Sequence, residues 1–338
     1  MEIVNEISTS TKKSMKQRVI TGIIMAVVML PCLIFGDWLF VILVCGIVGV
    51  GLHEIIKCSD KKYPWYVVLI LYIFTYSFVF WTFFQKDMSV QSSVAEYVAS
   101  PWYDFVGGRF YMYDIRLSTM GVGSLFTSLF IVAIINPKFE LKDVFYLFGM
   151  SLFIGFAAQS VLFLRFVSES LVPENFVYPH HLCSSLLFVT VAFGTMFNDI
   201  FAYFTGILFG KHKMNERVSP KKTWEGFFGG VILSTLFTLG FILLCDKVFN
   251  CPVLPGIFDA EHWYYNIFLG LTLSLGAVVG DLVFSLIKRT YGIKDFGYIF
   301  PGHGGVLDRF DSMLFTCMLA AILITFIYYN PVFGAFGI

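Results

Sequence analysis

The sequence predicts an all-α, polytopic integral membrane protein. Of its 338 residues 57% are hydrophobic and only 14% are charged, and the apolar residues gather in long runs. About 20 apolar residues, rising roughly 1.5 Å each, cross the ~30 Å hydrocarbon layer of a bilayer. A soluble domain cannot bury so much apolar surface, so the composition excludes that class.

The apolar runs predict about nine transmembrane helices. The first two are short and only Gly36-Asp37 separates them, so they form either a tight helical hairpin or one re-entrant unit. We expect an N-terminal transmembrane region at 1–183, with about five helices and an outer loop at 85–116, and a C-terminal catalytic transmembrane region at 184–338. The expected spans are 19–35, 38–52, 65–84, 117–135, 144–164, 184–208, 227–245, 264–287 and 312–329.

The distribution of basic residues predicts the orientation, because cytoplasmic loops carry an excess of Lys and Arg. With a cytoplasmic N-terminus and an outside C-terminus, the cytoplasmic side holds most of the 23 basic residues. The outer side keeps Lys86, Arg109, Arg116, Arg165 and Lys247. A miscounted span would move every later loop across the membrane. We therefore expect a multi-pass protein of the cell inner or plasma membrane; the net charge of zero gives no reason to expect nucleic acid.

The cysteines give no sign of a metal site. They show no CxxC spacing and most lie in apolar runs, so we predict that they are small packing residues. They are Cys32, Cys45, Cys58, Cys183, Cys245, Cys251 and Cys317.

Two carboxylates lie inside predicted spans. Asp199 falls in span 184–208, and Asp281 falls near the inner end of span 264–287. A charge in hydrocarbon costs about 2.5–3.5 kcal/mol, so such residues face a partner helix or a polar cavity. Because both lie in the inner half, near charged loops, a metal or substrate role is favoured.

Two charged segments flank these spans on the predicted cytoplasmic side. In the first, Ser219-Pro220 suits a turn or helix start, Lys221 and Lys222 suit phosphate contacts, and Thr223 suits a hydrogen bond to the ligand. The second segment, Ser285–Asp311, has Lys288, Arg289, Lys294 and Arg309 to neutralise phosphate, and the glycine-rich Gly302-His303-Gly304-Gly305 to approach anionic oxygens.

The carboxylates of the second segment favour a magnesium site. Asp308 and Asp311 are three residues apart and share a helical face. Mg²⁺ prefers carboxylates together with substrate phosphates. No GxxxxGK[ST] phosphate loop is present in the sequence. The pattern indicates metal-assisted phosphoryl or nucleotidyl transfer onto a lipid.

The same residues resemble the phosphatidate cytidylyltransferase (CDP-diacylglycerol synthase) family, in its bacterial form. The segment 199–226 is similar to a second family block, although Phe197-Asn198 before Asp199 and Ile200 after it depart from the common pattern. The family signature is met at Ser285, Lys288-Arg289, Lys294-Asp295, Gly297, Pro301, His303-Gly304-Gly305, Asp308-Arg309 and Asp311.

The resemblance implies a nucleotidyltransferase of phospholipid biosynthesis, which converts CTP and phosphatidic acid into CDP-diacylglycerol and pyrophosphate. It implies a two-cation site with Mg²⁺, and with K⁺ as an option for the second cation, held by Asp281 and Asp308 with Asp199 as a further ligand. The expected catalytic residues are Asp281, Asp308, Asp311, Lys294 and Arg309. The expected substrate-binding residues are Ser219, Lys221, Lys222, Thr223, Lys288, Arg289, His303, Gly304 and Gly305.

Two other functions remain open at this stage. A CTP-dependent lipid or polyprenol kinase uses the same nucleotide but releases CDP. A transporter for an anionic solute also buries carboxylates, although transporters usually show paired repeats that are not evident here. A homodimer is compatible with this class of membrane enzyme, but no motif marks an interface.

Overall fold

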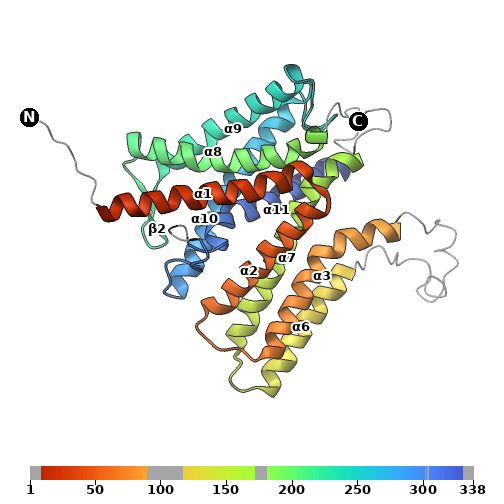
Figure 1. Cartoon of the computed structure of the whole chain (residues 1–338), viewed down its shortest axis with the longest axis vertical. Coiled ribbons are helices and arrows are strands. Elements are labelled where there is room, and N and C mark those ends of the chain that lie inside the picture. The colour runs from red at the N-terminus through yellow and green to blue at the C-terminus, as the bar shows by residue number, and fades with distance from the viewer. Residues whose placement is uncertain (1–8, 90–116, 172–180, 301, 303, 330–338) are drawn as a thin grey trace, which may run out of the picture. The chain divides into compact units, whose positions relative to one another are not determined.

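The computed structural model describes residues 9–89, 117–171, 181–300, 302 and 304–329. These residues are mostly α-helical, with a short 3-10 helix and a small two-stranded sheet (Figure 1). The chain forms two compact units, a large unit of Met1–Ile47 with Ser160–Ile338 and a small unit of Val48–Gln159. The predicted all-helical class is confirmed. The functional division at residue 183 stays a prediction.

The small unit is a set of apolar helices packed along their lengths. Leu71, Phe78 and Leu125 are fully buried in its core. In this unit α3 and α6 lie side by side (Figure 1). Helix α3 includes residues 85–89 of the expected outer loop, and residues 90–116 lie outside the described part of the chain. The unit contains the second half of α2 (Asp37–Cys58), α3 (Trp65–Ser89), α6 (Leu117–Ile135) and the first part of α7 (Leu141–Leu171).

Two loops meet at one end of the small unit. The buried Asp143 carboxylate accepts hydrogen bonds from Lys61 Nζ at 2.8 Å, Tyr63 Oη at 3.2 Å and the backbone N of Glu140 at 2.9 Å. The bond to Asp143 raises the pKa of the Lys61 amine. These contacts place the loop after α2 and the loop after α6 at the same end of the unit.

The large unit carries the remaining helices and the sheet. Within it α8 packs against α9, α9 against α10, and α10 against α11. Small residues permit these close approaches, as is common between membrane helices. A Cβ atom on Gly230 would lie 2.8 Å from the Cβ of Ala202, and one on Gly280 would lie 2.8 Å from the Cβ of Phe315. Its helices include α1 (Thr9–Phe35), η1 (His181–Ser185), α8 (Leu186–Phe209), α9 (Trp224–Lys247), α10 (Trp263–Thr290) and α11 (Leu307–Tyr329).

An α-helix occurs at the position of each expected span. In the described part of the chain, six helices are long and apolar enough to cross a bilayer, namely α2, α7, α8, α9, α10 and α11. The apolar stretches of α1, α3 and α6 are shorter. Large apolar side chains such as Ile207, Leu236 and Phe326 are exposed, as expected of helices that face lipid. These features are those of a membrane protein, while the count of nine spans stays a prediction.

The first two expected spans are two separate helices. Gly36 has a positive φ of 64°, which only glycine adopts readily, and it ends α1 immediately before α2 begins at Asp37. Its backbone N donates to the carbonyl of Cys32 at 3.0 Å and closes the last turn of α1.

The small sheet was not predicted. Strand β1 (Lys213–Asn215) pairs antiparallel with β2 (Ser219–Thr223), where the sequence suggested a turn or helix start at Ser219-Pro220. The turn is closed by Asn215, whose Oδ1 accepts from the backbone N of Val218 at 3.1 Å. Helix α9 then starts one residue later than β2 ends, with Thr223 Oγ1 accepting from Gly226 N at 3.2 Å as an N-cap.

Candidate active site

Helix α10 carries three polar side chains on one face. Asp281, Ser285 and Lys288 are spaced by four and three residues, so they lie along the same side of the helix. Ser285 Oγ donates to Asp281 Oδ1 at 3.4 Å. A Cβ atom on Gly280 would lie 3.0 Å from the carbonyl oxygen of Asp311. The backbones of α10 and α11 therefore approach each other closely at the level of Asp281.

Asp308, in the first turn of α11, is the most connected of the candidate residues. Its side chain is nearly inaccessible to solvent, and Lys288 Nζ donates to its Oδ1 at 2.9 Å. Its Oδ2 accepts from the backbone N of Phe296 at 2.7 Å and of Gly305 at 2.9 Å. Asp308 thus fastens the loop between α10 and α11 to the start of α11, where a negative charge is also favoured by the helix dipole.

A second ion pair joins the sheet to α10. Lys222, in β2, has its Nζ 2.5 Å from Asp281 Oδ2. Both side chains are partly exposed, at 25% and 30%. This contact brings the Ser219–Thr223 strand to the face of α10 that carries Asp281, Ser285 and Lys288.

Two further carboxylates belong to the same electrostatic cluster. Asp199 on α8 interacts with Lys222, Asp281 and Asp311 through its charge. Asp311 on α11 interacts in the same way with Asp281, Lys288 and Asp308. Four carboxylates from three helices therefore share the field of two lysines, and we call this group the acidic cluster: Asp199, Asp281, Asp308 and Asp311.

The structure divides the basic residues into two classes. Lys222 and Lys288 each pair with a carboxylate of the acidic cluster. The other four are exposed, and no ion pair involves them within the described residues; they are Lys221, Arg289, Lys294 and Arg309. The two paired lysines neutralise carboxylates of the protein itself, and the other four side chains are open to solvent.

The glycine-rich loop uses its backbone groups internally. Gly304 has a φ of +88°, and a Cβ atom there would lie 2.9 Å from Asp308 Oδ2. Its N donates to the carbonyl of Phe300 at 3.1 Å, and the N of Gly305 donates to Asp308. Both glycines therefore shape the loop around Asp308, and both N–H groups have acceptors within the protein. His303 lies outside the described residues.

One supporting residue received no role in the sequence analysis. Glu225, in the first turn of α9, accepts from His212 Nδ1 at 2.6 Å and from the backbone N of Lys211 at 3.1 Å. It holds the start of the hairpin against α9. The signal in the sequence is an acidic residue two positions after the N-cap Thr223, in the first helical turn, which the helix dipole favours. Thr223 itself is buried, and Ser219 is half-buried at the start of β2.

The acidic cluster suits a hard cation by the chemistry of its donors. Carboxylate oxygens combined with substrate phosphates are the usual ligands of Mg²⁺. Among the described residues, however, no three His, Cys, Asp or Glu side chains are arranged as a ready set of ligands. Asp281 and Asp308 are each paired with a lysine instead.

Comparison with known proteins gives a consistent result. Residues 16–327 match the model of the Cytidylyltransferase family. A phosphatidate cytidylyltransferase of Bacillus subtilis is 28% identical over 304 residues, which is 89% of this chain and 94% of that protein. One from Staphylococcus aureus is 28% identical over 310 residues, 92% of this chain and 99% of that protein. One from Staphylococcus epidermidis is 39% identical over 160 residues, 47% of this chain and 57% of that protein.

Proposed function

Since the chain belongs to the cytidylyltransferase family, we propose that it is a phosphatidate cytidylyltransferase, a nucleotidyltransferase of phospholipid biosynthesis. Its substrates are CTP and phosphatidic acid, and its products are CDP-diacylglycerol and pyrophosphate. The observation that carries this proposal is the match along almost the whole chain to relatives of that name, together with a charged cluster at the ends of apolar helices.

The charge arrangement suits this reaction. An oxygen of the lipid phosphate attacks the α-phosphorus of CTP, and pyrophosphate leaves with the bonding electron pair. Both reactants are anions, so the site must neutralise them and hold them in line more than it must supply a covalent nucleophile. Lys221, Arg289, Lys294 and Arg309 are exposed and available for this purpose.

We assign the cations to the acidic cluster. Asp281 and Asp308, with Asp199 as a further ligand, would hold Mg²⁺ and a second cation, Mg²⁺ or K⁺, whose charge stabilises the phosphates of CTP. Lys222 pairs with Asp281 and Lys288 pairs with Asp308, so both lysines lie beside the proposed cation ligands. We expect both lysines to turn toward phosphate oxygens when substrates arrive, because a phosphate is the alternative anion within their reach.

The orientation of the chain in the membrane is inferred from the basic residues of its loops. We propose a multi-pass protein of the cell inner or plasma membrane with nine spans, a cytoplasmic N-terminus and an outside C-terminus. The Ser219–Thr223 strand and the loop after α10 then both face the cytoplasm, where CTP is available. The basic residues near these spans support this orientation. A homodimer stays a prediction.

Product analysis tests the reaction. The purified protein is incubated in mixed micelles with phosphatidate, Mg²⁺ and CTP labelled separately in the cytidine and in the γ-phosphate. We expect the cytidine label in the lipid and the γ-label in pyrophosphate. Release of CDP with the γ-label in the lipid would instead identify a lipid kinase. Solute uptake into vesicles without nucleotide consumption would identify a transporter.

A further inference from the structure

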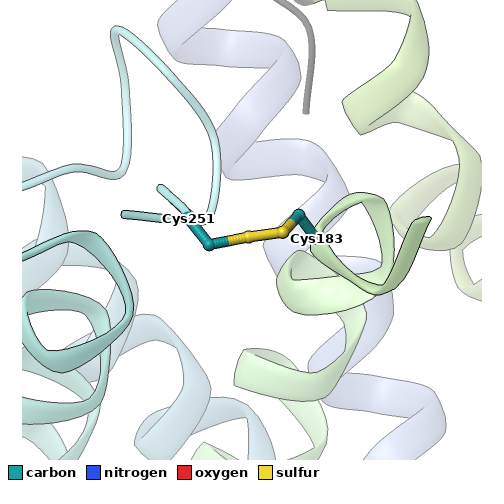
Figure 2. Close-up of a disulfide and its surroundings, with 2 residues drawn as sticks. All are labelled: Cys183 and Cys251. Carbon is teal, nitrogen blue, oxygen red and sulfur yellow. A yellow bond between two sulfur atoms is a disulfide. The ribbon is translucent and has the colours of Figure 1, made fainter. Parts of the chain in front are cut away.

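The structure links two cysteines that the sequence predicts to be packing residues. Cys183 in η1 and Cys251 after α9 form a disulfide, with their Cα atoms 5.8 Å apart (Figure 2). Both residues are buried, at 4% and 5% exposure. The packing interpretation was therefore wrong for this pair. It failed because the two residues are 68 positions apart, and only the antiparallel packing of α8 and α9 brings them together.

The disulfide lies at the opposite end of these helices from the acidic cluster. Cys183 lies in η1, just before the start of α8, and the β1–β2 hairpin with Lys222 follows the end of α8. Helix α9 starts at that hairpin and ends just before Cys251. Each helix has 24 residues, which at about 1.5 Å per residue is roughly 36 Å, enough to cross the hydrocarbon layer. The disulfide and Lys222 consequently belong to opposite faces of the membrane.

The segment that holds Cys251 is an ordered cap on the ends of α9 and α10. Asp259 accepts from the backbone N of Gly256 at 2.8 Å and from that of His262 at 3.0 Å. The Asp246 carboxylate at the end of α9 accepts from Ala260 N at 2.8 Å. Within this segment the side chains of Leu254 and Phe258 are fully buried. The disulfide ties this folded cap, and with it α9 and α10, to the start of α8.

We propose that Cys183–Cys251 is a structural disulfide on the extracytoplasmic face, which clamps the outer ends of the helices that carry the acidic cluster. Disulfides persist in oxidising compartments, whereas cysteine thiols in the cytosol are kept reduced. The bond forms by thiol–disulfide exchange with an oxidant disulfide of that compartment: the two cysteine thiols become a cystine, and the oxidant disulfide becomes two thiols. The proposal does not rest on nucleotidyl transfer, but it requires the proposed orientation.

The bond itself is tested by differential thiol labelling of the full-length protein. Cells are lysed in denaturing detergent with a small maleimide, and the protein is then reduced and treated with a polyethylene-glycol maleimide. We expect a mass shift for two thiols in the wild type and none in the Cys183→Ser/Cys251→Ser variant. A wild-type protein without a shift would overturn the proposal. Cys245→Ser is the matched control, because this buried cysteine is free and the shift should remain.

The face is tested by single reporter cysteines in the Cys183→Ser/Cys251→Ser background. Glu261→Cys places an exposed thiol in the cap, and Lys213→Cys places one in the hairpin. A membrane-impermeant maleimide added to intact cells should label Glu261→Cys at once and Lys213→Cys only after permeabilisation. The background variant without a reporter corrects for other cysteines. The reverse pattern would place the cap in the cytosol and overturn the assignment.

The clamp is tested by thermal unfolding in detergent. Closing a loop of this size should raise the unfolding temperature by about 8–16 °C. A reductant should therefore lower it by that amount in the wild type and should leave Cys183→Ser/Cys251→Ser unchanged. Equal unfolding temperatures of the oxidised and reduced wild type would refute a stabilising clamp. None of these three measurements consumes CTP, so their failure is distinguishable from failure of the proposed reaction.

Discussion

Replacing Asp281 and Asp308 by asparagine should separate catalysis from folding. Both substitutions remove a carboxylate of the acidic cluster, and both should reduce turnover by at least about 100-fold, the usual order when a group that stabilises transition-state charge is lost. Their effects on stability should differ, because their surroundings differ. Asp281 pairs with a partly exposed lysine and accepts one long hydrogen bond from Ser285, whereas the buried Asp308 accepts hydrogen bonds from three donors.

The loss of stability expected for Asp308→Asn can be worked out from the hydrogen-bond donors around the carboxylate. An amide has one oxygen, so its NH2 group must face either the backbone N–H groups of Phe296 and Gly305 or the Lys288 amine. Leaving such donors unpaired costs about 1–3 kcal/mol each, so the free energy of unfolding should fall by roughly 2–4 kcal/mol. For Asp281→Asn the loss should be under about 1 kcal/mol, because partly exposed ion pairs contribute little.

The assay combines thermal unfolding in detergent with pyrophosphate release from CTP. We expect an unfolding temperature lowered by about 5 °C or more for Asp308→Asn and nearly unchanged for Asp281→Asn. Ser285→Ala is the matched control, since it removes only the 3.4 Å bond to Asp281. Unchanged stability of Asp308→Asn would refute its role as the anchor of the loop. Near-normal turnover of Asp281→Asn would refute its place in the reaction.

Three other changes test separate parts of the protein. Arg289→Ala removes an exposed cation, so KM for CTP or phosphatidate should rise about 10-fold with unchanged stability, and an unaltered KM in substrate titrations would contradict its phosphate contact. Gly280→Val places methyl groups against Phe315 and should lower the free energy of unfolding by about 1–3 kcal/mol; a thermal unfolding temperature equal to the wild type would contradict close packing there. Burial raises the pKa of Asp259, but hydrogen bonds from His262 and Gly256 outweigh it and hold this pKa below its usual value. The carboxylate of Asp259 therefore stabilises the fold above about pH 4, and this stabilisation is lost as the pH falls through the lowered pKa. Asp259→Asn should therefore flatten the acid side of the curve of unfolding temperature against pH, and an unchanged curve would contradict this.

Several features of the fold were predictable because they depend on local sequence. An apolar run long enough to cross a bilayer must satisfy its backbone hydrogen bonds internally, so it becomes a helix wherever it occurs. Helices accordingly appear at the expected positions. The β1–β2 hairpin could not be predicted in this way, because strands of three and five residues are too short to show a clear alternation of apolar and polar side chains.

The candidate site was predictable in its members more than in its connections. The spacing of Asp281, Ser285 and Lys288 fixes that they share a face of α10, since a helix brings positions three and four apart together. Nothing in that spacing shows that Lys288 pairs with Asp308 while Lys222 pairs with Asp281. Nor does it show that the N–H of Gly304 donates to Phe300 and that of Gly305 to Asp308.

The all-helical membrane class, the charged segments at the helix ends and the family can all be predicted from the order of the amino acids. The pairing of each lysine with its carboxylate, and the contact of Cys183 with Cys251 across 68 residues, become visible in the folded protein alone. This difference arises because helix formation and residue spacing depend on neighbours along the chain. Ion pairs and disulfides between helices depend instead on how closely the backbones approach, which residues such as Gly230 and Gly280 control.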